Sequence, residues 1–302
     1  MSVTACSFLP AATRMIQHLG CTDQLVGVTF ECPIERPRVV RSRLEGPTRT
    51  SEEINAIVSE YKARGESLYY IDREVLADLQ PDVIFTQDVC PVCQIDTPMV
   101  EAAVQQLPKV PRIVPLLPHR LEEVWQDLRT VALHLEAEKA GEEAMEKIKK
   151  RLSAVRHAVQ NTRRKKIAFL EWPDPLYNCG HWIPDQIDIA GGKDDLANPG
   201  GYSRAIAWSQ LQHYNPELLI FGACGLPLSQ AAEEVGRLAR YEGWSQLQAV
   251  QQQQVYAVDG DWFTCPGPEL VNGVELLAHL LHPASVPRPD RVDGHFQPVV
   301  AG

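Results

Sequence analysis

Six of the eight cysteines in this 302-residue sequence follow predicted buried strands, in loops where side chains can meet in one site. They are Cys32, Cys90, Cys93, Cys179, Cys224 and Cys265. As thiolates they could bind zinc, copper or an iron–sulfur cluster, which would give a redox or sensing protein. However, Cys90 and Cys93 form the only C-x-x-C pair, and proteins often bury cysteine as a small apolar side chain. Both interpretations stay open.

Aromatic side chains gather in the same predicted loops, and these are Trp172, Tyr177, Trp182, Trp262 and Phe263. Together they predict a stacking surface for a flat apolar ligand, although each alone is also explained by packing beneath a loop. His181 could supply an axial nitrogen to a metal in a macrocycle, or it could bind the backbone. Glu171 and Asp88 also stand at strand ends, where caps and hinge hydrogen bonds are their ordinary roles.

The elements that position these loops alternate between strands and helices. Apolar runs bounded by Pro, Gly and Asp recur, and buried strands are predicted at 25–30, 83–86, 112–117, 166–170, 218–221 and 255–258. A helix is predicted from Ser51, with Glu52 and Glu53 in its first turn, to Gly65. The alternation indicates an α/β fold with mainly parallel sheets, whose ligands bind beyond the carboxyl ends of the strands.

Two features divide the chain. Residues 121–160 lack proline and carry apolar residues at helical spacing, which predicts either one long helix joining two lobes or a helical hairpin broken near Gly141. The segments LADLQPDVIFTQDVC and LQHYNPELLIFGACG are near-repeats, with Pro81 and Pro216 at equivalent positions, so each half is expected to hold one lobe. The proline-rich segment after Leu281 is expected to be a mobile tail.

The composition and the absence of certain motifs argue against several classes of function. A net charge of −10 argues against binding nucleic acid, and no apolar run is long enough for membrane insertion. The start of the sequence shows no export signal and the cysteines are scattered, so a cytoplasmic location is expected in preference to a periplasmic one. Nucleotide-binding and hydrolase motifs are absent, so we expect no enzyme and no required cofactor.

The opening SFLPAATRMIQHLGCTDQLVGVTFECP resembles the start of the cobalamin-binding and ferric-chelate-binding substrate-binding proteins of ABC importers. The resemblance continues through LADLQPDVIFTQDVCPVC, GHWIPDQIDIAGG and VYAVDGDWFTCPGPELVNGVELLAHLLHP. The Gln-Asp-x-Cys-x-x-Cys run is its most specific mark, and it is typical of a subgroup that often lacks an export signal.

This resemblance implies two α/β lobes with mainly parallel sheets, joined by one long rigid helix, with the ligand in a cleft between the lobes. The expected boundaries are 1–118 for the first lobe, 119–162 for the linking helix, 163–283 for the second lobe and 284–302 for the tail. The expected ligand is a corrinoid or another metal chelate, held for uptake or intracellular handling, and an ABC permease is the implied partner. The expected ligand contacts are Ser7, Phe8, Pro10, Glu31, Gln87, Asp88, Glu171, Trp172, Tyr177, His181, Trp182, Trp262 and Phe263. The alternatives are the cysteine-ligated metalloprotein and an enzyme acting on a corrinoid, for which the sequence offers no catalytic set.

Overall fold

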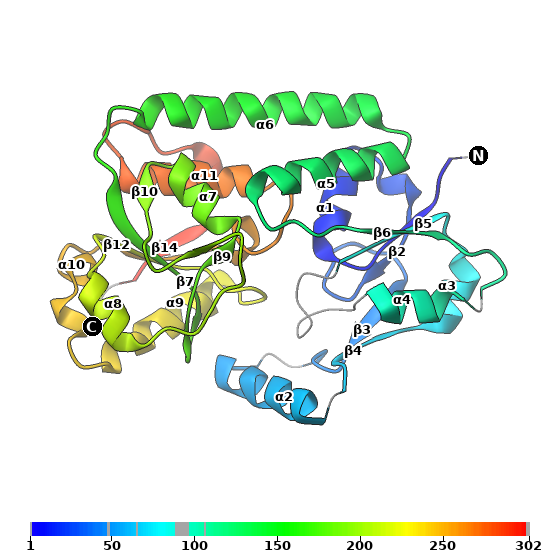
Figure 1. Ribbon diagram of the computed structural model, residues 1–302, viewed down its shortest axis with the longest axis horizontal. Coiled ribbons are helices and arrows are strands. Elements are labelled where there is room, and N and C mark those ends of the chain that lie inside the picture. Colours follow the sequence, from blue (N-terminus) through cyan, green and yellow to red (C-terminus); the bar gives the residue numbers. More distant parts are fainter. Residues whose placement is uncertain (1, 47–48, 65, 88–96, 106, 300–302) are drawn as a thin grey trace. The chain divides into compact units, whose positions relative to one another are not determined.

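A computed structural model describes residues 2–46, 49–64, 66–87, 97–105 and 107–299 (Figure 1). The chain divides into two compact units. Unit 1 contains Met1–Pro118 and Glu122–Glu146, and unit 2 contains His119–Leu121 and Lys147–Gly302. Each unit has its own mainly parallel sheet, so the predicted α/β class with two sheets is confirmed.

Six strands form one sheet in the described part of unit 1, in the order β4-β3-β2-β1-β5-β6. The strands are β1 (Ala5–Ser7), β2 (Leu25–Thr29), β3 (Arg38–Ser42), β4 (Tyr69–Ile71), β5 (Val83–Thr86) and β6 (Arg112–Pro115). The helices are α1 (Pro10–His18), α2 (Ser51–Arg64), α3 (Arg73–Leu79), α4 (Thr97–Val104) and α5 (Leu121–His134). Only β4 runs antiparallel to its neighbour, so the other five strands end at one edge of the sheet.

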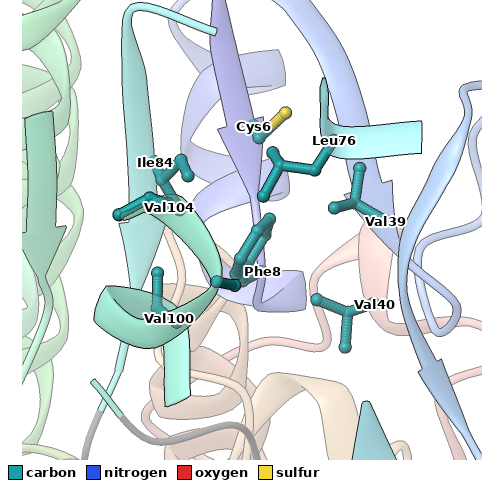
Figure 2. Packing of buried hydrophobic residues seen from close by; sticks show 9 residues of the cluster. Cys6, Phe8, Val39, Val40, Leu76, Ile84, Val100 and Val104 are labelled. Atoms are coloured by element: carbon teal, nitrogen blue, oxygen red, sulfur yellow. The ribbon is translucent and has the colours of Figure 1, made fainter. Parts of the chain in front are cut away.

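A buried apolar cluster holds α3 and α4 against the unit 1 sheet. Figure 2 shows Phe8 in the middle of this cluster, with Val100 and Val104 of α4 on one side and Val39 and Val40 of β3 on the other. Phe8 is 5% exposed, and most of its neighbours are less exposed still. Burial of such side chains contributes about 1.5–3 kcal/mol each, which makes this cluster a main source of stability in unit 1.

In unit 2 the sheet has the order β10-β7-β12-β13-β14, and β8 pairs with β7. Its strands are β7 (Lys165–Pro173), β8 (Leu176–Asn178), β10 (Gly192–Lys193), β12 (Leu218–Phe221), β13 (Val255–Val258) and β14 (Phe296–Pro298). The strands β9 (Gly180–His181) and β11 (Asn198–Pro199) form a separate parallel pair. The helices are α7 (Ile183–Ile189), α8 (Trp208–Tyr214), α9 (Leu228–Arg237), α10 (Gln248–Gln251) and α11 (Leu270–Leu281). In Figure 1, α7 and α11 lie together on one side of this sheet and α9 on the other.

The near-repeat in the sequence corresponds to the same helix-to-strand junction in each unit. The C-cap residues of α3 and α8 are Gln80 and Asn215. Both residues adopt a left-handed conformation, with φ of 43° and 48°. Proline follows each of them, at Pro81 and Pro216, and cannot continue a helix. The chain then enters β5 in unit 1 and β12 in unit 2, at the bounds that the sequence predicts.

The proline-free segment forms two helices, α5 and α6 (Glu138–Val159), so a single helix across 121–160 is wrong. The break lies at residues 135–137, where Glu136 has φ of 56° and the Ala137 N–H donates to the Ala132 carbonyl at 2.8 Å. This pattern is typical of a Schellman helix end. Gly141 lies inside α6, where a Cβ atom would come within 2.8 Å of the Ala132 Cβ, so this glycine permits close helix packing and does not break the helix.

The helix α2 begins at Ser51, as the sequence predicts, and Thr50 caps it: the Thr50 N–H donates to Glu53 and the Glu53 N–H donates to the Thr50 hydroxyl. One further expectation needs correction. Within the segment after Leu281, expected to be a mobile tail, residues Phe296–Pro298 form β14, which pairs antiparallel with β13. Low periodicity misled the prediction because three residues are too few to show a strand pattern.

Candidate functional site

The predicted loop after Leu170 is largely ordered structure. β7 continues to Pro173 and turns back as β8, so that Trp172 lies opposite Tyr177. Both side chains are partly exposed, and the Trp172 Nε1 is buried without a hydrogen-bond partner among the described residues. These two aromatic side chains therefore keep free surface, and their predicted contact with a ligand stays a prediction.

Glu171 holds the next turn of the chain in place. Its Oε1 accepts a hydrogen bond from the Gly180 N–H at 2.9 Å, and its carboxyl group is also hydrogen-bonded to the Ser203 side chain. Burial raises the pKa of Glu171 to about 7. A Cβ on Gly180 would lie 2.4 Å from the Gly201 carbonyl oxygen, so only glycine at position 180 lets the backbone of residue 201 approach so closely. Glu171 thus forms hydrogen bonds to the protein itself, which is an ordinary role for a residue at the end of a strand.

His181 occupies a constrained position next to this turn. Its φ is 49°, a left-handed conformation that few residues other than glycine adopt, although histidine does so more often than most. The backbone is fixed on both sides, because the His181 N–H donates to Gly201 at 2.7 Å and the His181 carbonyl accepts from Gly200 at 2.9 Å. Unusual backbone conformations of this kind cluster at functional sites.

The His181 imidazole is surrounded by rings. His119 stacks on it with centroids 6.1 Å apart, Tyr202 meets it edge-on at 5.3 Å, and Trp182 lies at 5.2 Å. The His181 Nδ1 is buried and has no hydrogen-bond partner among the described residues. Burial first, and then the nearby His119, lower the pKa of His181 to about 4. The His181 imidazole is therefore neutral near pH 7, which is the form in which histidine binds a metal.

Sequence reasoning missed two members of this ring cluster, His119 and Tyr202. Both side chains are exposed, and both belong to unit 2 together with His181. The signal for His119 was present, because it follows the predicted strand 112–117 and therefore stands in a strand-end loop like the others. Tyr202 lies in a short glycine-containing turn with no comparable signal.

Three of the predicted ligand-contacting aromatic residues are packed inside unit 2. The Trp182 Nε1 donates to the Phe263 carbonyl at 2.6 Å, Phe263 packs on Phe169 with centroids 4.9 Å apart, and Trp262 stacks on His295. Trp182 and Trp262 are each 5% exposed, and Phe263 is fully buried. Their observed contacts are with the protein itself, so their predicted contact with a ligand stays a prediction.

The unit 1 residues expected at the ligand also differ in exposure. The Ser7 hydroxyl is buried and donates to the Leu9 carbonyl at 2.7 Å, and Phe8 belongs to the apolar cluster of Figure 2. Pro10 begins α1, Gln87 is buried after β5, and Glu31 is exposed. Asp88 lies outside the described residues.

The cysteines do not form a metal site in the described part of the chain. The Cys32 thiol lies 3.0 Å from the Thr13 hydroxyl, and the Cys179 thiol donates to Asp194 at 3.7 Å. Burial raises the pKa of both thiols, which disfavours the thiolate that metals bind. Cys224 is exposed and Cys265 is partly exposed, while Cys90 and Cys93 fall outside the described ranges. Among the residues that are described, no three His, Cys, Asp or Glu side chains are grouped to hold an ion.

The chain thus has two α/β units, each with its own sheet, and a histidine surrounded by rings in unit 2. Comparison of its sequence with known families shows that the chain belongs to the periplasmic binding protein family, which matches residues 10–261. Because this family consists of binding proteins, membership supports binding and not catalysis.

Individual relatives agree with this assignment. The chain is 21% identical over 285 residues to YvrC, an uncharacterised ABC transporter substrate-binding lipoprotein of Bacillus subtilis, covering 92% of this chain and 79% of that protein. The fold is similar to the vitamin B12-binding protein BtuF of Vibrio cholerae, with a TM-score of 0.65, 19% identity and coverage of 94% and 98% of the two chains. It is also similar to the haem-binding protein RhuT of Roseiflexus, with a TM-score of 0.68, 18% identity and coverage of 94% and 100%.

The expected cytoplasmic location is wrong, because these relatives are a lipoprotein and periplasmic proteins. The cysteines misled that expectation. Cys6, Cys21, Cys32 and Cys179 are buried, and burial raises the pKa of each thiol, so these thiols are protected without a reducing compartment. In the described part of the chain, every helix is too short or too polar to cross a membrane.

Proposed function

We propose that this protein is the substrate-binding component of an ABC importer and that its ligand is a metal chelate with a flat apolar face, such as a corrinoid or a haem. The observation that supports this most is the imidazole of His181, which is neutral at pH 7 and is surrounded by three rings. The ligands named for BtuF and RhuT, vitamin B12 and haem, belong to this chemical class.

The physical argument has two parts. A macrocycle face gains free energy by stacking on exposed aromatic rings, and Tyr202 is 49% exposed beside His181. A metal in such a ring accepts an axial nitrogen, and a histidine whose pKa is near 4 supplies one without first losing a proton at pH 7. Trp172 and Tyr177, both partly exposed, are proposed to extend the stacking surface.

In this proposal the partner is an ABC permease, and no cofactor is needed besides the ligand itself. The cysteine-ligated metalloprotein has no support, because the buried thiols of Cys32 and Cys179 have raised pKa values and bind protein groups.

The test is a binding panel of cyanocobalamin, cobinamide, haemin and a ferric siderophore, measured by absorbance titration and calorimetry. We expect one of these chelates to bind with micromolar or tighter affinity, and we expect His181→Ala to change its absorption spectrum. His213→Ala is the matched control, because His213 is an exposed histidine on α8 outside the ring cluster. Failure of all four chelates to bind would refute the proposed ligand class.

A further inference from the structure

The loop after β13 is tied to the ring cluster through two backbone carbonyls. The Trp262 carbonyl accepts a hydrogen bond from the Gln186 side chain at 3.0 Å, and the Phe263 carbonyl accepts one from the Trp182 indole at 2.6 Å. Trp182 immediately precedes α7, and its ring lies 5.2 Å from that of His181. The position of this loop therefore sets the position of Trp182, one of the three rings around the imidazole.

A residue from the end of the chain holds the same loop. The His295 imidazole stacks on Trp262 with ring centroids 4.0 Å apart and an angle of 20°, the closest ring pair in the described part of the protein. The His295 Nδ1 lies 2.8 Å from the Asp259 Oδ2, and the Asp259 N–H donates to the His295 carbonyl at 2.8 Å. His295 thus contacts Asp259 and Trp262 of the loop, and it directly precedes β14, which pairs with β13.

We propose that His295 is a positioning residue for the ligand site of unit 2. It acts through Trp262 and the carbonyls of that loop on Trp182, and through Trp182 on the His181 ring. Without the imidazole, one face of the Trp262 ring has no stacking partner. The loop then gains conformational freedom, and the rings around His181 lose their fixed geometry. This proposal rests on the proposed function, because it assigns a residue to that same site.

The first experiment compares chelate affinity in matched variants. Haemin and cyanocobalamin are titrated into the wild type, His295→Ala, His295→Phe and the control His213→Ala. An aromatic stack is worth about 0.5–1.5 kcal/mol, so we expect His295→Ala to weaken binding about two- to thirteen-fold. His295→Phe keeps a ring over Trp262 and is expected to restore most of the affinity, while His213→Ala is expected to bind like the wild type.

The second experiment needs no ligand. In protein with ¹³C-labelled histidine, the His181 ring resonance and its titration near pH 4 report the surroundings of the imidazole directly. We expect both to change in His295→Ala and to return toward the wild type in His295→Phe. If the wild type binds neither of these two chelates, they are not its ligands, and this measurement still decides the role of His295.

Clear outcomes would overturn the proposal. One is a His295→Ala protein with wild-type affinity and an unmoved His181 resonance. Another is a His295→Phe protein as impaired as His295→Ala, which would refute the stacking argument. If His295→Ala does not fold, Asp259→Asn takes its place, because it removes the charged partner of the imidazole but keeps the ring. We expect Asp259→Asn to move the His181 resonance in the same direction, and no movement would count against the proposal.

Discussion

Replacement of Glu171 by glutamine should change how stability depends on pH. Burial raises the pKa of Glu171 from 4.5 to about 7, so the folded chain keeps this proton over a pH range in which the unfolded chain has lost it. The neutral carboxyl group therefore contributes fully to the free energy of unfolding below pH 4.5. This contribution is lost as the pH rises from 4.5 through 7. Glutamine resembles the neutral acid and never ionises, so this loss disappears in the variant.

The magnitude follows from the two pKa values. Their difference, at 1.36 kcal/mol for each pKa unit, corresponds to about 3 kcal/mol between pH 4.5 and pH 8. Asp194 is also buried and its pKa is raised to about 6, so some dependence of the same sign persists in the variant. We thus expect Glu171→Gln to be more stable than the wild type at pH 8 and nearly equal to it at pH 5.

Urea unfolding at pH 5 and pH 8 measures this difference. Glu146→Gln is the control, because Glu146 is an exposed glutamate on α6 and its neutralisation should leave the curve unchanged. A Glu171→Gln protein whose stability falls between pH 5 and pH 8 as steeply as that of the wild type would refute the reasoning.

Three other outcomes are expected. Chelate affinity should stay constant from pH 7 to about pH 5 and fall as His181 protonates near pH 4, and titrations across that range would show any earlier loss. Phe8→Ala should destabilise the protein by about 3–5 kcal/mol in urea unfolding because it leaves a cavity in the apolar cluster, and an unchanged urea midpoint would contradict the burial of Phe8. Gly141→Ala should destabilise because its Cβ meets Ala132, whereas Gly236→Ala, with open space around it, should stabilise by about 0.5–1 kcal/mol, and thermal unfolding of the pair compares them.

The sequence predicted the buried strands best. The bounds of β5, β12 and β13 match because each is a mainly apolar run that follows a polar residue (Asp82, Glu217 or Gln254) and is followed by a polar residue or glycine. Shorter strands such as β8 and β14 escaped, because pairing with β7 and β13 creates them and no periodicity shows in three residues.

Prediction of the site was limited by side-chain direction. The rule that ligands bind beyond strand ends selected His181 and the tryptophan-containing loops as candidates, but it does not say whether an indole faces out or in. Trp182 faces in because the Phe263 carbonyl takes its N–H, a contact between residues 81 positions apart that no local pattern reveals. His119 also stands in a strand-end loop, but nothing local distinguishes it, because its ring partners His181 and Tyr202 come from distant segments.

The short strands at the sheet borders bear on aggregation. The outermost strands are β4, β6, β10 and β14, and each has four residues or fewer. Two of them, β6 and β14, end in proline, at Pro115 and Pro298, which cannot donate a hydrogen bond to an incoming strand. Such edge strands expose few backbone groups that a strand of a second chain could pair with. They therefore reduce aggregation, also during folding, when the parallel sheets are still incomplete. A longer, proline-free segment engineered at Pro298 would remove that protection on one side of unit 2.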